Sequence, residues 1–324
     1  MSVANLRRNF TFPAVAGLAT LAVVLAVFGT GGSAFAVAMF CCGAFVLAAV
    51  VQEFWRGVRA RGAMSHEAPP VALAQLVRRN RRRYGGYVVH AGLAVLLIGV
   101  AASTSFQHSH YASLKPGQSA RVDGYTVRYV RPTASATAQR ISFGAKLRVF
   151  KGHHLVTTLY TQHELYPSQD ASLGPIGRFF NGSDETRIGL RSGFTRDIWT
   201  VVNPSLQPLQ ALISRGNRVF TQAMVSSMRR LAAANVPPSR AQAELAPLWQ
   251  DRDRAISELV SRYVTHPWPV TFLFIVSPLV MWLWIGALIV IGGALIALWP
   301  APALAWLRAR SAAYAGRRLA REPA

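Results

Sequence analysis

A membrane-length apolar stretch follows directly after a cluster of arginines and contains one histidine. It reads RRNRRRYGGYVVHAGLAVLLIGVA over residues 78–101, with His90 about two turns inside. An ionisable side chain within a bilayer is costly, so it usually marks a ligand, a proton path or a cofactor. The alternative is a histidine that packs between helices and hydrogen-bonds a neighbouring hydroxyl or carbonyl. The first question is therefore what His90 holds.

The whole chain has the composition of a membrane protein, with 52% apolar and 15% charged residues. Four apolar stretches reach the roughly 20 residues that a helix needs to cross the hydrocarbon core. The first two are joined by a short turn over residues 29–33, and Pro278 breaks the entry to the last, leaving residues 269–276 as an interfacial approach. We expect the four spans at about 12–30, 31–55, 84–105 and 278–299.

The arginines predict the orientation of these spans. Residues 56–83 carry eight Lys/Arg against Glu67 alone, and residues 308–324 carry five against Glu322. Short basic segments of this kind stay in the cytoplasm. Both termini are therefore expected inside, with residues 106–268 outside.

The formal charge of +22 does not by itself predict nucleic-acid binding. Fifteen of the 35 Lys/Arg residues flank membrane helices, and no nucleic-acid-binding motif accompanies the rest. Contact with anionic lipid headgroups is the better explanation. The adjacent Cys41 and Cys42 suit neither a redox pair nor a metal site, and we interpret them as small apolar residues of the second span.

The external region divides into a β-rich part and a helical part. Alternating and β-branched segments such as RVDGYTVRYV and LVTTLYTQHELY predict strands. Apolar positions three and four apart predict two helices over residues 205–262, separated at Val236–Ser239. The predicted fold class is an α-helical membrane protein with four transmembrane helices and an external β-rich domain plus helical hairpin.

These patterns divide the chain into six segments. They are an N-terminal two-helix membrane hairpin (1–55), a basic cytoplasmic loop (56–83) and the His90 transmembrane helix (84–105). A periplasmic β-rich domain (106–268), a C-terminal transmembrane helix (269–299) and a basic cytoplasmic tail (300–324) follow.

Several segments resemble CcmF-type haem lyases, the CcmF/NrfE/CcsA family of cytochrome c-type biogenesis proteins. RRNRRRYGGYVVHAGLAVLLIGVAAS is similar to the family segment that carries the later of two intramembrane histidines. Other segments also resemble the family and occur in the family's order. QEFWRGVRAR precedes the His90 segment, and the segments after it are KPGQSARVDGYTVRY, ELYPSQ, TRIGLRSGFTRDIWTVV and SPLVMWLWIGALIVIGGALIALWP. The match covers most of residues 5–300, and residues 207–262 are the least similar part.

The family's N-terminal motifs do not occur in this sequence. It has no W-G-x-x-W-x-W-D run, no counterpart of the two external haem-ligating histidines and no partner intramembrane histidine. The resemblance is thus to the C-terminal part of a haem lyase. It implies either a separately encoded subunit or a fragment, and a chain that is not competent without the N-terminal half.

What the resemblance implies for His90 is a role as one axial ligand of an intramembrane haem b. Gly86 and Ala94 would flank the imidazole and let a flat macrocycle approach. With ~1.5 Å rise per residue, His90 lies on the order of 9 Å in from Tyr84. No residue of this chain is expected to act as a general acid, base or nucleophile.

The implied setting is the bacterial inner membrane and the cytochrome c maturation system. The implied partners are the N-terminal haem-lyase half, a CcmE-type haem chaperone, a CcmH-type thiol partner, apocytochrome c with its C-x-x-C-H motif, the quinol pool and the lipid bilayer. The alternative function is a non-catalytic, membrane-anchored periplasmic scaffold or adaptor in which His90 only packs. The external histidines and arginines are expected to be solvated surface residues.

Overall fold

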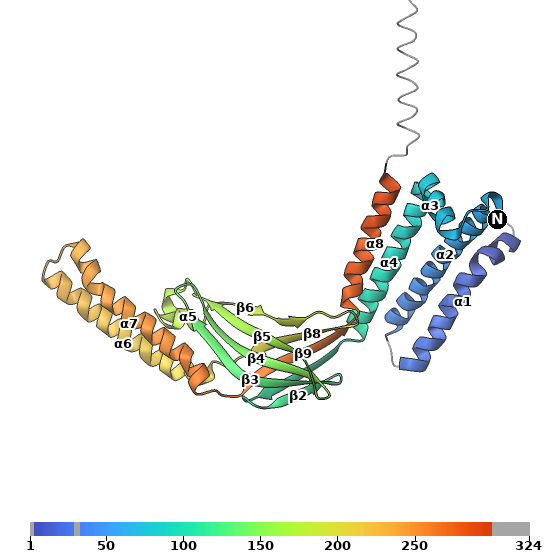
Figure 1. Ribbon diagram of the computed structural model, residues 1–324. Coiled ribbons are helices and arrows are strands. Elements are labelled where there is room, and N and C mark those ends of the chain that lie inside the picture. Colours follow the sequence, from blue (N-terminus) through green and yellow to red (C-terminus); the bar gives the residue numbers. More distant parts are fainter. Residues whose placement is uncertain (1–2, 29–32, 300–324) are drawn as a thin grey trace, which may run out of the picture. The chain divides into compact units, whose positions relative to one another are not determined.

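The computed structural model describes residues 3–28 and 33–299 and divides the chain into two compact units (Figure 1). The helical unit comprises Met1–Phe106 with Pro278–Ala324, and the β-rich unit comprises Gln107–Ser277. The basic tail over residues 300–324 and, apart from Ser33, the turn expected over 29–33 lie outside the described residues.

The described part of the helical unit contains five helices. They are α1 (Val3–Phe28), α2 (Ala34–Ser65), α3 (Pro69–Arg79), α4 (Arg81–Ser105) and α8 (Val280–Leu298). Four helical stretches are long and apolar enough to cross a membrane, namely Asn5–Ala26, Ala34–Ser65, Arg81–Ser105 and Val280–Leu298. The prediction of four membrane helices is confirmed.

The basic segment 56–83, which was expected to connect two spans, is mainly helical. Helix α2 continues to Ser65, because arginine and alanine are good helix formers whose long or small side chains lose little freedom. It ends where His66 takes a left-handed conformation with φ 54°. Pro69 and Pro70 then occupy the first turn of α3, where a proline costs no hydrogen bond.

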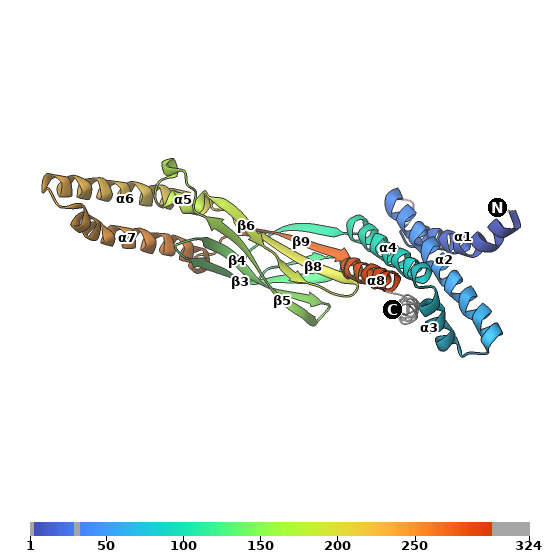
Figure 2. The same cartoon turned by 90° about the horizontal axis from the view of Figure 1, so that it is seen from above.

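Helices α4 and α8 pack against each other through glycines spaced seven residues apart. A Cβ added at Gly92 would lie 2.6 Å from the Val290 nitrogen and 2.8 Å from the Gly286 oxygen. One at Gly85 would lie 2.7 Å from the Gly293 oxygen. Only glycine allows two backbones to approach this closely, which is how membrane helices commonly associate. Figures 1 and 2 both show the two helices side by side.

Helix α2 packs on another side of α4. A Cβ at Gly43 would lie 2.7 Å from a side-chain carbon of Ile98, and the Phe54 and Tyr84 rings lie 5.0 Å apart between centroids. Helix α4 is therefore held on two sides by other helices of the same chain.

The β-rich unit consists of two antiparallel sheets. In one, the strand order is β1 (His108–Leu114), β9 (Val270–Pro278), β8 (Arg196–Asn203) and β7 (Gly189–Arg191). In the other, it is β2 (Ser119–Val122), β3 (Tyr125–Ala136), β4 (Ile141–Lys151), β5 (His154–Tyr166) and β6 (Ser183–Arg187). A short 3-10 helix (Ala171–Leu173) and α5 (Gly177–Phe180) lie between β5 and β6.

Residues 269–276, which were expected to approach the last span, belong to strand β9 from Val270 on. Val270, Phe272 and Phe274 are buried and alternate with less buried residues, which is the period of a half-buried strand. Strand β9 pairs with β1 from Leu114↔Val270 to His108↔Val276. The apolar run is therefore used in a sheet and not in the last membrane helix.

The predicted helical hairpin is confirmed as α6 (Gln207–Ala233) and α7 (Pro238–Thr265), which run side by side in Figures 1 and 2. Its inner face joins the sheet core. The Tyr263 ring of α7 lies 5.3 Å from that of Phe143 in β4 and 5.3 Å from that of Trp268, between centroids. Because burying such aromatic surface is strongly favourable, the hairpin base is part of the β-rich unit's core.

The glycine packing predicts that neighbouring glycines of α8 respond differently to the same substitution. Gly293→Ala places a Cβ 2.7 Å from the Val89 nitrogen, whereas at Gly292 nothing lies within 4 Å. Overpacking of this kind costs about 1–3 kcal/mol. We expect Gly293→Ala to lower the melting temperature of the full chain in detergent and Gly292→Ala to leave it unchanged or raise it. Equal melting of the two variants would contradict the close packing.

Candidate functional site

The third side of α4 is open and carries His90. The His90 side chain is exposed, and so are those of Leu93 (44%) and Leu97 (43%) on the same side of the helix. A Cβ added at Gly86, one turn before His90, would meet nothing within 4 Å. Among the described residues, this face of α4 therefore has no helix packed against it, and a flat group or another helix has room to approach the imidazole.

A hydrogen bond within α4 fixes the orientation of the His90 ring. Its Nδ1 lies 2.7 Å from the carbonyl oxygen of Gly86. A carbonyl only accepts hydrogen bonds, so Nδ1 is the nitrogen that carries the proton and donates it. In the neutral ring, Nε2 then has the lone pair that can bind a metal ion.

Of the two small residues expected beside His90, only Gly86 lies on the open face. Successive residues of a helix are rotated by about 100° around its axis. Viewed along the axis, Gly86 and Leu97 lie to one side of His90, whereas Ala94 lies about 40° to the other side. Ala94 is 3% exposed, and its carbonyl oxygen would lie 3.6 Å from a Cβ at Gly43 in α2. The open face is thus lined by Gly86, Leu93 and Leu97, while Ala94 belongs to the α2–α4 contact.

A polar network ties the start of α4 to α2, and sequence reasoning did not find it. Arg83 forms a 2.7 Å ion pair with Glu53, and its Nε donates to the Tyr87 hydroxyl at 2.9 Å. Tyr87 in turn donates to Glu53 at 3.2 Å. Glu53 is the only acidic residue of α2, and this was the available signal, because a lone carboxylate beside a membrane helix usually has a basic partner.

The remaining histidines do not gather into a metal site. His108 and His110 are exposed on the same side of strand β1, and His153 and His154 lie at the turn between β4 and β5. Within residues 3–28 and 33–299, no group of three or more His, Cys, Asp or Glu residues is arranged to hold a metal ion. His90 is also the single histidine within the four candidate spans.

Three of the external arginines bind carboxylates of the β-rich unit. Glu164 is buried, with Arg140 2.7 Å and Arg187 3.0 Å from its oxygens. Arg196 forms an ion pair with Asp123. These guanidinium groups have partners within the fold, and their role here is to neutralise charge on the sheet.

No protein-family model matches the sequence. The chain is 28% identical over 206 residues to cytochrome c-type biogenesis protein ccl1 of Rhodobacter capsulatus, covering 62% of this chain and 27% of that protein. It is 27% identical over 235 residues to cytochrome c-type biogenesis protein CycK of Bradyrhizobium diazoefficiens, covering 72% of this chain and 35% of that protein. It is 22% identical to CcmF of Pseudomonas aeruginosa, covering 60% of this chain and 26% of that protein.

A solved structure of the cytochrome c haem lyase CcmF has a similar fold. It aligns with a TM-score of 0.52 at 17% identity and covers 93% of this chain but 35% of the solved chain. The resemblance to CcmF-type proteins is therefore confirmed, and the chain spans about a third or less of the length of the relatives it matches.

One external histidine predicts a pH dependence of stability. Burial lowers the pKa of the His163 imidazole, although Asp184, 3.9 Å away, acts in the opposite direction. His163 therefore binds a proton more readily in the unfolded chain than in the folded one. Below about pH 6.5, the usual pKa of histidine, this difference lowers the free energy of unfolding as the pH falls. We expect a smaller drop in melting temperature between about pH 7 and pH 5 for the full-chain variant His163→Gln. An unchanged drop would show that other groups cause the acid sensitivity.

Proposed function

From the similarity to CcmF-type proteins, we propose that this chain is the C-terminal membrane part of a haem lyase in cytochrome c maturation. His90 would supply one axial ligand of an intramembrane haem b. The observation that carries the proposal is the open face of α4, where the imidazole is exposed and its Nδ1 is hydrogen-bonded to Gly86.

The residues of this face fit a haem group. The Nδ1–H bond holds the ring in the tautomer whose Nε2 can bind iron. Gly86 leaves open space one turn away, and Leu93 and Leu97 offer an apolar surface for a porphyrin. A bound haem would supply one-electron redox chemistry, while the chain contributes a ligand, orientation and an apolar surround.

The second axial ligand is proposed to come from a partner. A haem held by two histidines needs a second imidazole at a similar depth, and the four candidate spans contain only His90. The N-terminal haem-lyase half is the proposed source, and it would pack on the open side of α4. The need for a partner agrees with the coverage of the relatives, because the chain spans 35% of CycK and 27% of ccl1.

The proposed orientation places the arginine-rich ends of α2, α3 and α4 in the cytoplasm and the β-rich unit in the periplasm. There the β-rich unit would contribute to the surface that receives a CcmE-type haem chaperone, a CcmH-type thiol partner and apocytochrome c. Electrons for the haem at His90 would come from the quinol pool. The thioether bonds would form between the apocytochrome's C-x-x-C-H thiols and the vinyl groups of the delivered haem.

Substitution of the histidine tests the proposed ligand. The chain is co-expressed with an N-terminal haem-lyase half, and a reduced-minus-oxidised absorption spectrum is recorded on the purified complex. We expect His90→Ala to lose at least about tenfold of the b-type signal, because the Fe–N bond is lost. His66→Asn is the control, since asparagine tolerates the left-handed conformation at that position. An unchanged spectrum for His90→Ala, with both halves still co-purifying, would remove His90 as the ligand.

Gly86 offers a second test that leaves the ligand in place. Because the space beside it is open, Gly86→Leu should not disturb the fold of this chain, but its side chain would occupy the surface that a porphyrin needs. We expect a reduced haem content with an unchanged melting temperature of the isolated chain. Gly292→Ala, on a glycine of α8 with open space around it, is the matched control and should keep the haem. Full haem content in Gly86→Leu would place the binding surface elsewhere.

A further inference from the structure

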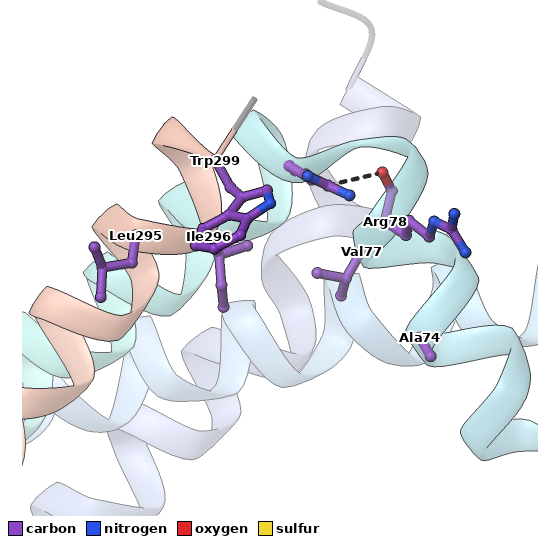
Figure 3. A pocket seen from close by; sticks show the side chains of 7 residues that line it. Ala74, Val77, Arg78, Leu295, Ile296 and Trp299 are labelled. Atoms are coloured by element: carbon purple, nitrogen blue, oxygen red, sulfur yellow. Dashed lines mark hydrogen bonds between the residues drawn. The ribbon is translucent and has the colours of Figure 1, made fainter. Parts of the chain in front are cut away.

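A pocket of about 300 Å³ lies where the end of α3 and the start of α4 face the end of α8 (Figure 3). Its wall is apolar and includes Val77, Leu295 and Ile296. Arg78 and Arg81 line it as well, and the Nε of Arg81 donates to the Arg78 carbonyl at 3.2 Å, the bond dashed in Figure 3. Trp299 completes the lining from the end of α8.

The charge around this pocket is positive. None of the described residues that line it is acidic. The described part of the helical unit has two acidic residues, and both bind other arginines: Glu53 pairs with Arg83 at 2.7 Å, and Glu67 pairs with Arg61 at 2.8 Å. Among the residues that the structure describes, the charges at the junction of α3 and α4 are therefore mainly positive, and an anion would be attracted to them.

The position of the pocket selects the kind of anion. It lies at the last residues of one candidate span, α8, and at the first residues of another, α4. The ends of membrane helices lie at the depth of lipid headgroups, where tryptophan and arginine are typical. Guanidinium groups bind phosphate through paired N–H donors. An apolar wall next to such donors suits a phosphate attached to an acyl chain better than a free ion.

We propose that this pocket binds an anionic phospholipid. Its phosphate would lie on Arg78 and Arg81, its headgroup beside Trp299, and the upper part of an acyl chain along Leu295 and Ile296. Basic pockets between membrane helices commonly bind lipid headgroups in this way. The bound lipid would link α3 to α8, which come from distant parts of the sequence.

Lipid binding to the full chain tests the proposal. The protein in neutral detergent is titrated with dioleoyl-phosphatidylglycerol or dioleoyl-phosphatidylcholine, and bound lipid is counted by native mass spectrometry. We expect phosphatidylglycerol to bind at least about tenfold more tightly, a difference of ~1.4 kcal/mol. The double variant Arg78→Gln/Arg81→Gln should reduce its affinity to that of phosphatidylcholine.

A charge-matched variant separates a site from a diffuse field. Arg79→Gln/Arg82→Gln removes two exposed arginines from the same cluster that do not line the pocket. It should keep phosphatidylglycerol affinity within about twofold, or ~0.4 kcal/mol. An equal loss in both double variants would overturn the proposal, because net charge alone would then explain the binding.

Inorganic phosphate distinguishes the two sources of the anion. If millimolar phosphate displaces the bound phosphatidylglycerol from the wild-type chain, the pocket binds a free anion and the lipid proposal fails. Retention of the lipid supports it. Leu295→Gln is the second variant: it changes only an exposed side chain of the apolar wall, and it should weaken lipid binding because the acyl contact is lost. Unchanged lipid binding in Leu295→Gln would contradict the acyl contact.

Discussion

The close packing of α4 on α8 determines the arrangement of the helical unit. Gly85 and Gly92 of α4 face Gly293 and Gly286 of α8 at distances that leave no space for a side chain. In a membrane, such contact replaces the hydrophobic driving force that is absent between helices in lipid. With α8 on one side and α2 on another, α4 has one side left, and His90 lies on it. The open histidine is thus a result of the glycine packing.

Much of the fold could be predicted from local patterns. Apolar length indicated the four membrane helices. Alternation indicated β3, and β-branched residues indicated β5, because these signals arise from neighbouring residues of one segment. The pairing of β1 with β9 could not be predicted, since it joins residues more than 150 positions apart, such as His108 and Val276. The apolar run 269–276 fits a strand or a helix entry equally well until its partner strand is known.

The geometry of the candidate site was predictable only in part. The sequence indicated His90 and the small residue Gly86, because an ionisable residue in an apolar helix is rare. It also placed Ala94 beside the imidazole, whereas Ala94 lies in the α2 contact, since a shift of about 40° around the helix decides between the two sides. The hydrogen bond from the His90 Nδ1 to the Gly86 carbonyl could not be predicted either, because it depends on the rotamer of the His90 side chain.

The seven-residue spacing of the glycines has a consequence for helix register. A displacement of α8 along α4 by one repeat, about 10 Å, would again bring glycine opposite glycine, so the glycines alone do not distinguish two alignments. The two helices also continue into a pair of strands whose register is specified separately. Strand β1 follows α4 after Phe106 and Gln107, and β9 leads into α8 through Leu279 alone. The alternation of buried residues fixes the β1–β9 register, and each helix is joined to its strand by one or two residues.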